Sequence, residues 1–509
     1  MSAQVTTDDL KRAAPSDWLH YSGQYHSQRH SLLRQVDTAN VKHLVPAWIY
    51  NIRGARRLES VPIVADGVMY VSQTDEVYAL DARTGRLVWD WRHSNPLQRG
   101  PNRGVALFGN KVYIGTSDAK LVALDARNGS VVWTAKLAEA ADGYWCPVAP
   151  LIVNGKVIIG IAPGDHGLNG FLDAYDAQTG ERLWRWNSIP GPGEPGHETW
   201  PGDSWKTGGG NTWLTGSFDP ELNLIYWGTG NPAPDFDGDV RKGDNLYTES
   251  MIALDANSGK MKWYFQFTPW DVHDWDAVEI PVLVDAPYQG VTRKLLVQAN
   301  RNGYYYVLDR VSGKFLHGTP FINKLNWASG LTKEGRPIRV PGIVPTVQGV
   351  KTCPSTSGAT NWMSPAYNPD TGLFYVVARE GCGINTKSRD TFRPGGFPFM
   401  ATGYTESPAD PWQNYVRALD LTTGKLRWEY KQTGVKLYGA GLLSTAGNLL
   451  FAGDDQGEFT ALDARDGKEL WHFNTGQQIT ASPVTYGVKG KQYVAIAAGS
   501  NVVAFALHE

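Results

Sequence analysis

The sequence predicts an all-β fold, an eight-bladed β-propeller whose blades dock through tryptophan. Its 509 residues include 56 Gly, 20 Trp and 23 Tyr, a composition typical of many short strands joined by tight turns. One phrase also recurs, in which an Asp opens a turn that ends in Gly, and a Trp stands eight residues after the Asp. The six complete copies contain the pairs Asp81 and Trp89, Asp125 and Trp133, Asp176 and Trp184, Asp255 and Trp263, Asp420 and Trp428, and Asp463 and Trp471.

Each copy predicts a β-hairpin, because strand residues flank a turn with Asp at its start and Gly where a positive φ is needed. A seventh copy around Asp309 lacks the Trp, and the intervals between the seven Asp residues are 44, 51, 79, 54, 111 and 43. A repeat of roughly forty to fifty residues is the size of a four-stranded propeller blade. We therefore expect the interval of 111 to contain a hidden blade around residues 372–380, which brings the count to eight. The excess in the interval of 79 is assigned to an insertion over residues 189–211.

The composition excludes several classes of function. The 48 basic and 50 acidic residues leave a formal net charge of -2, which argues against a nucleic-acid partner. No apolar run is long enough to span a membrane, and the polar opening MSAQVTTDDLKR indicates either a cytoplasmic protein or one whose leader has been removed. None of the three cysteines forms a CxxC pair or the CxxCH of covalent haem attachment. By composition alone, Cys353 and Cys382 are expected to be buried thiols.

Function is expected in the segments that break the repeat, because the repeated Asp and Trp residues are explained by hairpin turns and by packing between neighbouring blades. Three segments carry Asp, Asn or Trp beyond what turns require: residues 162–170, residues 208–213 together with 225–234, and residues 268–277. Carboxylate and amide oxygens on separate loops suit a hard cation such as calcium. His166 and His273 stand beside candidate ligands, but a hard cation prefers oxygen, so we do not expect them to bind it.

The repeat, GGGNTW, WGTGN and the TPWD…DWD segment together resemble the alcohol dehydrogenases that depend on pyrroloquinoline quinone (PQQ), the methanol and ethanol dehydrogenase family. The resemblance runs from DWLHYSGQYHSQRHS to GKQYVAIAAGSNVVAFAL, which is similar to the family's ring-closing blade. It implies that PQQ, held on a bound metal ion, oxidises an alcohol to an aldehyde or ketone. It also implies that residues 1–509 form a single PQQ-binding propeller domain without a C-terminal cytochrome domain.

The resemblance assigns roles to individual residues. Asp274 matches the catalytic base, which takes the proton of the alcohol hydroxyl. The residues that match contacts to PQQ are Glu59, Arg103, Trp213, Arg301 and Asn361, with Trp213 beneath the ring and Arg103 on a carboxylate. The implied metal ligands are Asp165, Asn231, Asp274 and Asp276. Asp165 stands where the family usually has Glu, and Asp276 stands where lanthanide-using members carry an extra ligand. The ion is therefore Ca²⁺ or a lanthanide, and the sequence does not choose between them.

Further expectations follow from the resemblance. Cys353 and Cys382 match a paired cysteine, which implies a disulfide and a periplasmic location. Leu97 and Gln98 replace the family's vicinal cysteines. Because the sequence has no haem motif, electrons are expected to pass to a separate acceptor, a soluble cytochrome c. The missing cysteine pair and the insertion over residues 395–412 predict a substrate bulkier than methanol, with that insertion, Trp270 and Trp275 at the rim of an apolar pocket.

Two alternatives remain from the sequence. A non-enzymatic propeller scaffold of the outer-membrane assembly type has the same repeat but needs none of Trp213, Asn231 and Asp274. A PQQ-dependent dehydrogenase of sugars or polyols shares the fold and differs only in its substrate.

Overall fold

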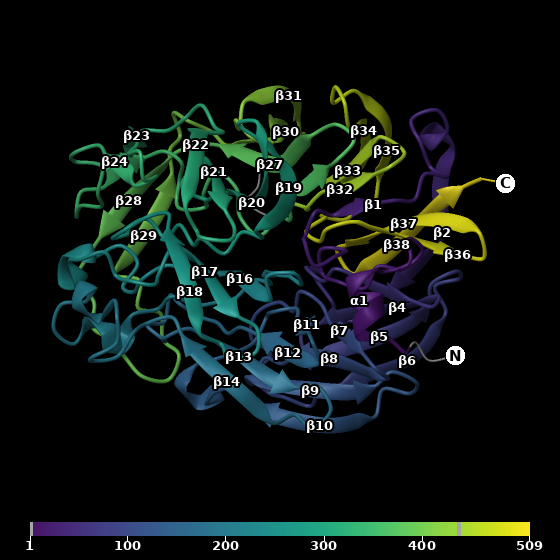
Figure 1. Ribbon diagram of the computed structural model, residues 1–509, viewed down its shortest axis with the longest axis horizontal. Coiled ribbons are helices and arrows are strands. Elements are labelled where there is room, and N and C mark those ends of the chain that lie inside the picture. The colour runs from purple at the N-terminus through teal and green to yellow at the C-terminus, as the bar shows by residue number, and fades with distance from the viewer. Residues whose placement is uncertain (1–3, 435–438, 509) are drawn as a thin grey trace.

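The computed structural model describes residues 4–434 and 439–508. Eight blades of four antiparallel strands surround a central axis and form the predicted ring, and a fifth, parallel strand extends the sheet of one blade (Figure 1). Blade 1 comprises β3 (Ile63–Ala65), β4 (Val68–Gln73), β5 (Glu76–Asp81) and β6 (Leu87–Arg92), and blade 2 comprises β7 (Ala106–Phe108), β8 (Lys111–Gly115), β9 (Lys120–Asp125) and β10 (Val131–Lys136). Blade 3 comprises β11 (Leu151–Val153), β12 (Lys156–Ile159), β13 (Phe171–Asp176) and β14 (Arg182–Asn187). Blade 4 comprises β15 (Ser217–Asp219), β16 (Leu224–Gly228), β17 (Ser250–Asp255) and β18 (Met261–Gln266).

Blades 5 to 8 complete the ring. Blade 5 comprises β19 (Val282–Tyr288), β20 (Val291–Ala299), β21 (Tyr304–Asp309) and β22 (Phe315–Pro320), and blade 6 comprises β26 (Ala366–Asn368), β27 (Leu373–Glu380), β30 (Gln413–Asp420) and β31 (Leu426–Lys431). Blade 7 comprises β32 (Leu443–Thr445), β33 (Leu449–Gly453), β34 (Glu458–Asp463) and β35 (Glu469–Asn474). Blade 8 comprises β36 (Val484–Val488), β37 (Lys491–Ala498), β38 (Asn501–Leu507) and β2 (Leu44–Asn51). The last blade takes its outer strand from near the start of the chain, with Asn51 opposite Asn501.

The remaining elements lie outside the four-stranded sheets. They are α1 (Thr7–Lys11), β1 (His30–Ser31), β23 (Ala328–Leu331), β24 (Pro337–Arg339), β25 (Val350–Thr352), β28 (Gly383–Lys387), β29 (Thr402–Glu406) and the short 3-10 helices η1 (Val41–His43), η2 (Ala140–Asp142), η3 (His197–Thr199), η4 (Ser204–Thr207) and η5 (Gly238–Arg241). Strands β25, β28 and β29 form a small sheet inserted into blade 6, and β1 pairs in parallel with β32. No helix in the described part of the chain is both long and apolar enough to cross a membrane.

The predicted count of eight blades is correct, but the predicted eighth blade is wrong. Residues 372–380 contain β27, which pairs with β30 and so belongs to the same blade as the repeat at Asp420. The long interval before Asp420 instead contains the β23–β24 pair and the β25–β28–β29 sheet. The eighth blade is the one that β2 and β38 close, and it carries no copy of the Asp-Gly-Trp phrase. Residues 189–211 form no strand, as expected of an insertion.

The repeated Trp residues join each blade to the next. The indole nitrogen of Trp89 donates to the Ala126 carbonyl of blade 2 at 3.0 Å, and the indole ring covers Gly129, where a Cβ would come within 2.6 Å of it. The same donation to a following blade is made by Trp184, Trp263, Trp428 and Trp471. In the seventh copy, His317 replaces Trp, and its Nε2 lies 2.9 Å from the Thr423 carbonyl of blade 6. The repeat is therefore architectural.

The N-terminal segment ties the inner strands of the ring together. Phe218 of blade 4, Leu283 of blade 5 and Tyr367 of blade 6 donate backbone hydrogen bonds to carbonyls of residues 25–28. Arg29 is fully buried and gives its guanidinium donors to the carbonyls of Tyr21, Leu442 and Pro483. Arg29 bonds to backbone carbonyls rather than to a carboxylate, and its charge-assisted hydrogen bonds therefore hold these chain segments together. The segment thus crosses the ring on its inner side.

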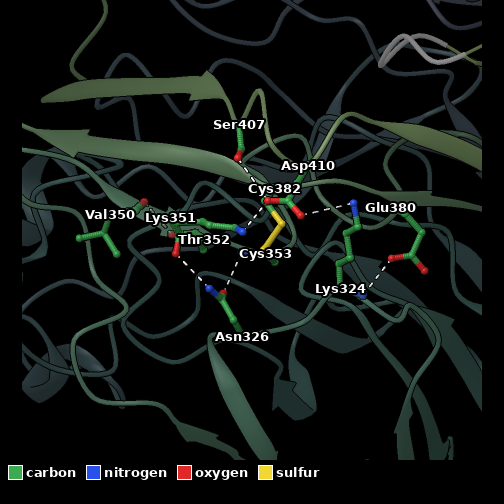
Figure 2. The surroundings of a disulfide bond; sticks show 10 residues. All are labelled: Lys324, Asn326, Val350, Lys351, Thr352, Cys353, Glu380, Cys382, Ser407 and Asp410. Atoms are coloured by element: carbon green, nitrogen blue, oxygen red, sulfur yellow. Dashed lines mark hydrogen bonds and ion pairs between the residues drawn. A yellow bond between two sulfur atoms is a disulfide. The ribbon is translucent and has the colours of Figure 1, made fainter.

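A disulfide joins Cys353, next to β25, to Cys382, which follows β27, with a Cα–Cα distance of 4.4 Å (Figure 2). Asn326 accepts from the Cys353 backbone nitrogen at 2.8 Å, and Asp410 pairs with Lys324 and Lys351 beside the sulfurs. This pairing is the one that the family resemblance implied, and the expectation of buried free thiols is wrong. The cross-link fastens the inserted sheet to blade 6.

Candidate active site

Loops that connect the strands of blades 1 to 6 line an open cavity of about 240 Å³. It brings together seven of the residues singled out by the sequence, namely Arg103, Asp165, Trp213, Asp274, Asp276, Arg301 and Asn361. These residues come from loops of blades 1 to 6, so only the closed ring places them side by side. The other two predicted residues stand directly behind the lining: Glu59 contacts Arg103, and Asn231 contacts Asp276.

Three carboxylates and one guanidinium dominate one side of the cavity. Nη1 of Arg301 lies 2.5 Å from Asp276, and its Nη2 lies 3.6 Å from Asp274 and donates to the Thr356 carbonyl at 2.8 Å. Burial raises the pKa of Asp165 to about 6, and the charge of Asp276 adds to this. Burial also raises the pKa of Asp274 well above its ordinary value, with Arg301 opposing the shift. The carboxylates therefore repel one another and gain from a cation among them.

Asp274 stands in a strained turn. Its φ of 59° lies in the left-handed region that residues other than Gly rarely adopt. The neighbouring Asp271 holds this turn, because its carboxylate accepts from the backbone nitrogens of His273 at 3.2 Å and Trp275 at 3.1 Å. The turn places the Asp274 carboxylate on the cavity wall while the side chains on either side of it are buried.

Asn231 is oriented so that its amide oxygen is available. Its backbone nitrogen donates to Asp276 at 2.9 Å, and its Nδ2 donates to Oδ1 of Asp235 at 2.8 Å. The side-chain oxygen thus points away from Asp235 and faces the loop of Asp165. A Cβ on Gly164 would come within 3.0 Å of that oxygen. Glycine at position 164 therefore lets the Asp165 loop approach the amide closely.

The opposite wall is aromatic and basic. The guanidinium carbon of Arg103 lies 4.8 Å from the centre of the Trp213 ring. Its Nη2 pairs with Glu59 at 2.8 Å, and Glu59 is also held by Arg57 at 2.8 Å. The buried Nε of Arg103 has no hydrogen-bond partner among the described residues. Asn361 accepts from the Trp362 backbone nitrogen at 3.0 Å and donates to the Ser357 carbonyl at 3.2 Å. This wall offers a ring face beside a free donor, which suits a flat, acidic ligand.

The donor set fits a hard cation. Oδ2 of Asp235, Oδ1 of Asn211 and both carboxylate oxygens of Glu249 are buried without a hydrogen-bond partner in the described part of the chain. Such orphaned oxygens are rare in folded proteins unless an ion or water satisfies them. No three His, Cys, Asp or Glu side chains among residues 4–434 and 439–508 already stand in the geometry of an assembled metal site. Asp235 and Glu249 lie close enough to Asp274 and Asp276 to feel their charges, so these unpartnered oxygens stand near the cavity lining.

Sequence reasoning missed several residues of the site. Trp145 and Trp362 line the cavity, and Asp235 and Glu249 are buried behind it. Asp235 stands one residue after the segment that ends at Pro234, so a slightly wider reading of the motif finds it. The two indoles lie outside the repeat and outside the recognised motifs, and only the tertiary structure reveals their place.

Two expectations about the rim are wrong. Trp275 is fully buried, contacts the His273 ring at a tilt and donates to the Ser355 carbonyl at 2.9 Å, while Trp270 donates to the Gly238 carbonyl. Neither lines the cavity, and neither do Leu97 and Gln98. Both tryptophans fill space between loops because their indole nitrogens find carbonyls there.

The insertion that was expected at the rim contacts the site through its first residues. The backbone nitrogen of Phe399 donates to the Asp165 carbonyl at 2.6 Å, and the Met400 carbonyl accepts from Phe236 at 3.0 Å. Gly396 packs against Gly143, where a Cβ on Gly143 would lie 2.3 Å from the Gly396 Cα. We call residues 395–401 the strap. It ties the loop of Asp165 to the loop that follows Asn231.

A propeller that surrounds a cavity with carboxylates, arginines and a tryptophan floor belongs to the class of ligand-binding propellers whose chemistry lies on the axis. The family model described as "Glucose/ethanol/alcohol dehydrogenase, beta-propeller domain" matches residues 18–320, more than half of the chain. A second model, "Outer membrane protein assembly factor BamB", matches residues 413–508.

Relatives cover nearly the whole chain. Quinoprotein alcohol dehydrogenase PedH of Pseudomonas putida is 41% identical over 93% of this chain and 84% of that protein. The crystal structure of quinohemoprotein alcohol dehydrogenase from Comamonas testosteroni superposes with a TM-score of 0.94 at 36% identity, over 99% of this chain and 82% of that chain. A europium-containing methanol dehydrogenase superposes with a TM-score of 0.91 at 31% identity, over 98% of this chain and 100% of that chain. The chain therefore belongs to the family of PQQ-dependent quinoprotein alcohol dehydrogenases.

The scaffold alternative is not supported. BamB from Moraxella catarrhalis superposes with a TM-score of 0.50 at 15% identity, which shows a shared fold and nothing more. The residues that a scaffold does not need, Trp213, Asn231 and Asp274, are gathered at one cavity and its immediate surroundings.

Proposed function

We propose that this chain oxidises an alcohol to an aldehyde or ketone, using PQQ and a cation bound in the central cavity. The observation that carries this proposal is the juxtaposition of Asp274, Arg301 and Trp213 around one cavity. When bound, the quinone supplies the hydride acceptor and the cation supplies the Lewis acid. The protein supplies the floor, the carboxylate clamps, the cation ligands and a base.

Asp274 is the proposed general base. Its carboxylate would take the proton of the alcohol hydroxyl, and a quinone bound in the cavity would supply the acceptor for the hydride of the alcohol carbon, so that both hydrogens removed from the alcohol have an acceptor. Arg301 lies 3.6 Å from Asp274, and its charge opposes the rise in the pKa of Asp274 that burial causes. A cation bound beside Asp274 would act in the same direction and favour the ionised base.

The other residues position the ligands. Trp213 would form the floor beneath a bound ring system, and Arg103 would offer its unpartnered Nε to a carboxylate of the cofactor. Glu59 holds Arg103 in place, and Asn361 contributes an amide to the wall. The proposed cation ligands are Asp165, Asn231, Asp274 and Asp276, with the ion either Ca²⁺ or a lanthanide.

The substrate is proposed to be bulkier than methanol. Besides Trp213, the cavity is lined by Trp145 and Trp362 together with apolar groups of Pro101, Pro147, Ala162 and Pro163. Such a lining gains little from a one-carbon alcohol and more from a larger apolar group. Turnover on methanol is to be compared with turnover on a large secondary alcohol and on an aldose. A preference for methanol would contradict this proposal, and a preference for the aldose would favour the sugar dehydrogenase.

The electron acceptor and the compartment are also proposals. Residues 1–509 contain no CxxCH motif, and we propose that they act as one PQQ domain whose electron acceptor is a soluble cytochrome c. The disulfide between Cys353 and Cys382 is typical of an oxidising compartment, which supports the periplasm.

One reconstitution experiment tests the proposed function. The purified chain is incubated with PQQ and either Ca²⁺ or La³⁺, freed of excess ligand and examined by absorption spectroscopy and alcohol-dependent dye reduction. We expect a retained quinone absorbance and dye reduction that requires both cofactor and cation. A Trp213→Ala variant, which removes the floor, should retain far less quinone. A chain that retains neither quinone nor cation would overturn the proposal.

A further inference from the structure

Asp235 is a fourth buried carboxylate at the proposed cation site, and the family resemblance assigns it no role. Its side chain is fully buried. Oδ1 accepts from the Asn231 amide at 2.8 Å, and Oδ2 has no hydrogen-bond partner among the described residues. The carboxylates of Asp165 and Asp274 lie close enough to that of Asp235 to repel it. An orphaned oxygen at such a place points to a positive charge that satisfies it.

The nearest guanidinium does not neutralise this oxygen directly. Arg241 is fully buried and donates to the backbone carbonyls of Pro234 at 2.9 Å, Asp235 at 3.2 Å and Asp271 at 2.6 Å. Its remaining donor binds the side chain of Asn245 at 3.0 Å. Arg241 therefore fixes the backbone of the loop and leaves the Asp235 carboxylate directed toward Asn231.

The strap holds this loop against the rest of the site. Met400 accepts from the residue after Asp235, and the preceding Phe399 donates to the carbonyl of Asp165. Two consecutive residues of the strap thus connect the loops that carry Asp165 and Asp235. The fold keeps the fourth carboxylate beside the other three at the expense of electrostatic repulsion, as expected for groups that bind a ligand.

We propose that Asp235 is a positioning residue for the cation, which holds the Asn231 amide oxygen toward the ion and adds a negative charge that favours a trivalent over a divalent cation. The inference rests on the proposed function, because it assumes that a cation occupies this cavity. The hydrogen bond from Nδ2 to Asp235 fixes which end of the amide faces the ion. The added charge strengthens the binding of every cation, but the Coulomb energy scales with the charge of the ion. A lanthanide therefore gains about one and a half times as much as Ca²⁺.

The test separates charge from orientation. Asp235→Asn removes the charge but keeps an oxygen that accepts from Asn231, and Asp235→Ser does the same with a smaller side chain. Asp235→Ala removes both the charge and the acceptor. The matched control is Asp237→Asn, because Asp237 is also a buried carboxylate of this loop but accepts from the Asp239 backbone nitrogen and faces Lys387.

Each protein is saturated with PQQ and titrated separately with Ca²⁺ and Eu³⁺ in equilibrium dialysis, and bound metal is measured by mass spectrometry. We expect Asp235→Asn and Asp235→Ser to weaken Ca²⁺ binding about tenfold and Eu³⁺ binding about thirtyfold, so that the ratio of the two affinities falls about threefold. Asp235→Ala should weaken both further because the amide of Asn231 loses its anchor. Asp237→Asn should leave the ratio unchanged.

The outcomes are distinguishable. If the wild-type protein binds cations and the ratio does not fall in either Asp235 variant, or falls equally in Asp237→Asn, the role of Asp235 is wrong while the proposed function stands. If the wild-type protein binds no cation in the presence of PQQ, the proposed function fails and this inference fails with it.

Discussion

Aspartate occurs in two contrasting regions of the molecule, the outer hairpins and the loops around the axis. In the hairpins, the carboxylate of Asp176 accepts from two backbone nitrogens and from Thr179, and these hydrogen bonds lower its pKa. Around the axis, Asp235 and Asp274 are buried among other carboxylates, and burial raises their pKa. In the outer hairpins, which form the rim of the propeller, the aspartate side chain is satisfied by hydrogen bonds within its own turn. In the loops around the axis, at the centre of the propeller, the same side chain needs a ligand.

This difference shows how to separate architecture from function in a repeat protein. A turn aspartate finds its partners within the next three residues, so its role follows from local sequence. An aspartate of the site has partners from distant loops, and part of its hydrogen-bonding capacity stays unused. Variants of the two kinds should therefore fail in different ways, the rim variants in stability and the central variants in ligand binding and turnover.

The largest effect is expected from Asp274→Asn. Loss of a general base lowers turnover by about 10²- to 10⁴-fold, because an amide cannot accept the proton of the alcohol hydroxyl as a carboxylate does. Dye reduction by the PQQ-loaded variant gives kcat, and the retained quinone absorbance shows that cofactor remains bound. Asp271→Asn serves as a comparison, since Asp271 holds the same turn without lining the cavity. Full turnover in Asp274→Asn would assign the base elsewhere.

The second prediction concerns the rim. Trp89→Ala removes the indole that covers Gly129 and donates to Ala126, and it should lower the free energy of unfolding by about 3–5 kcal/mol. Trp91 lies on the same strand but is half-buried and stacks on His93, so Trp91→Ala should cost much less. Urea unfolding followed by tryptophan fluorescence measures both. Equal losses would show that the docking geometry adds nothing to simple burial.

The sequence predicts the rim better than the closure of the ring. Six hairpins follow from an Asp, a Gly and a Trp within nine residues, the seventh has His317 in place of the Trp, and all seven hairpins are present in the structure. The closing blade pairs Asn51 with Asn501, and no local pattern reports a contact between such distant residues. The eighth blade was therefore placed at 372–380, where a strand exists but belongs to another sheet.

The candidate site is likewise predictable from the sequence only in part. Motifs of the family locate Asp274, Asn231 and Trp213, and the structure brings all three to one place. The burial of Glu249 and the unused oxygen of Asp235 depend on loops from different blades packing together. Such properties arise from tertiary structure and are absent from any single stretch of sequence.

A third prediction uses the buried carboxylates in the chain without cofactor or cation. Burial raises the pKa of Glu249 well above its ordinary value of 4.5, and Asp271 and Asp276 add to this. Because the folded pKa is the higher one, the stabilisation is complete at low pH and is lost as the pH rises through the folded pKa. Glu249→Gln stays neutral and should therefore unfold with a free energy about 1–3 kcal/mol higher than the wild type at pH 8. At pH 4 the two should differ little.

Thermal unfolding at both pH values measures this prediction. Glu181→Gln is the control, because Glu181 is exposed on a hairpin turn and should show no such dependence on pH. If the difference in stability between the wild type and Glu249→Gln is the same at pH 8 as at pH 4, the Glu249 carboxylate already has hydrogen-bond or charge partners, and the prediction is wrong.

The smallest effect is expected at a turn of the rim. The Asp255 carboxylate accepts from the backbone nitrogens of Asn257 and Ser258 and from the Ser258 hydroxyl, and the bond from this hydroxyl contributes most to lowering its pKa. Asp255→Ala should cost about 1 kcal/mol of unfolding free energy. Because the folded pKa is the lower one, this stabilisation is present above the unfolded pKa and is lost as the pH falls, the reverse of the trend at Glu249. Asp90→Ala, which breaks only an exposed pair with Arg92, should cost almost nothing. Opposite trends with pH in unfolding experiments on the Asp255 and Glu249 variants would establish the contrast between rim and centre, and parallel trends would remove it.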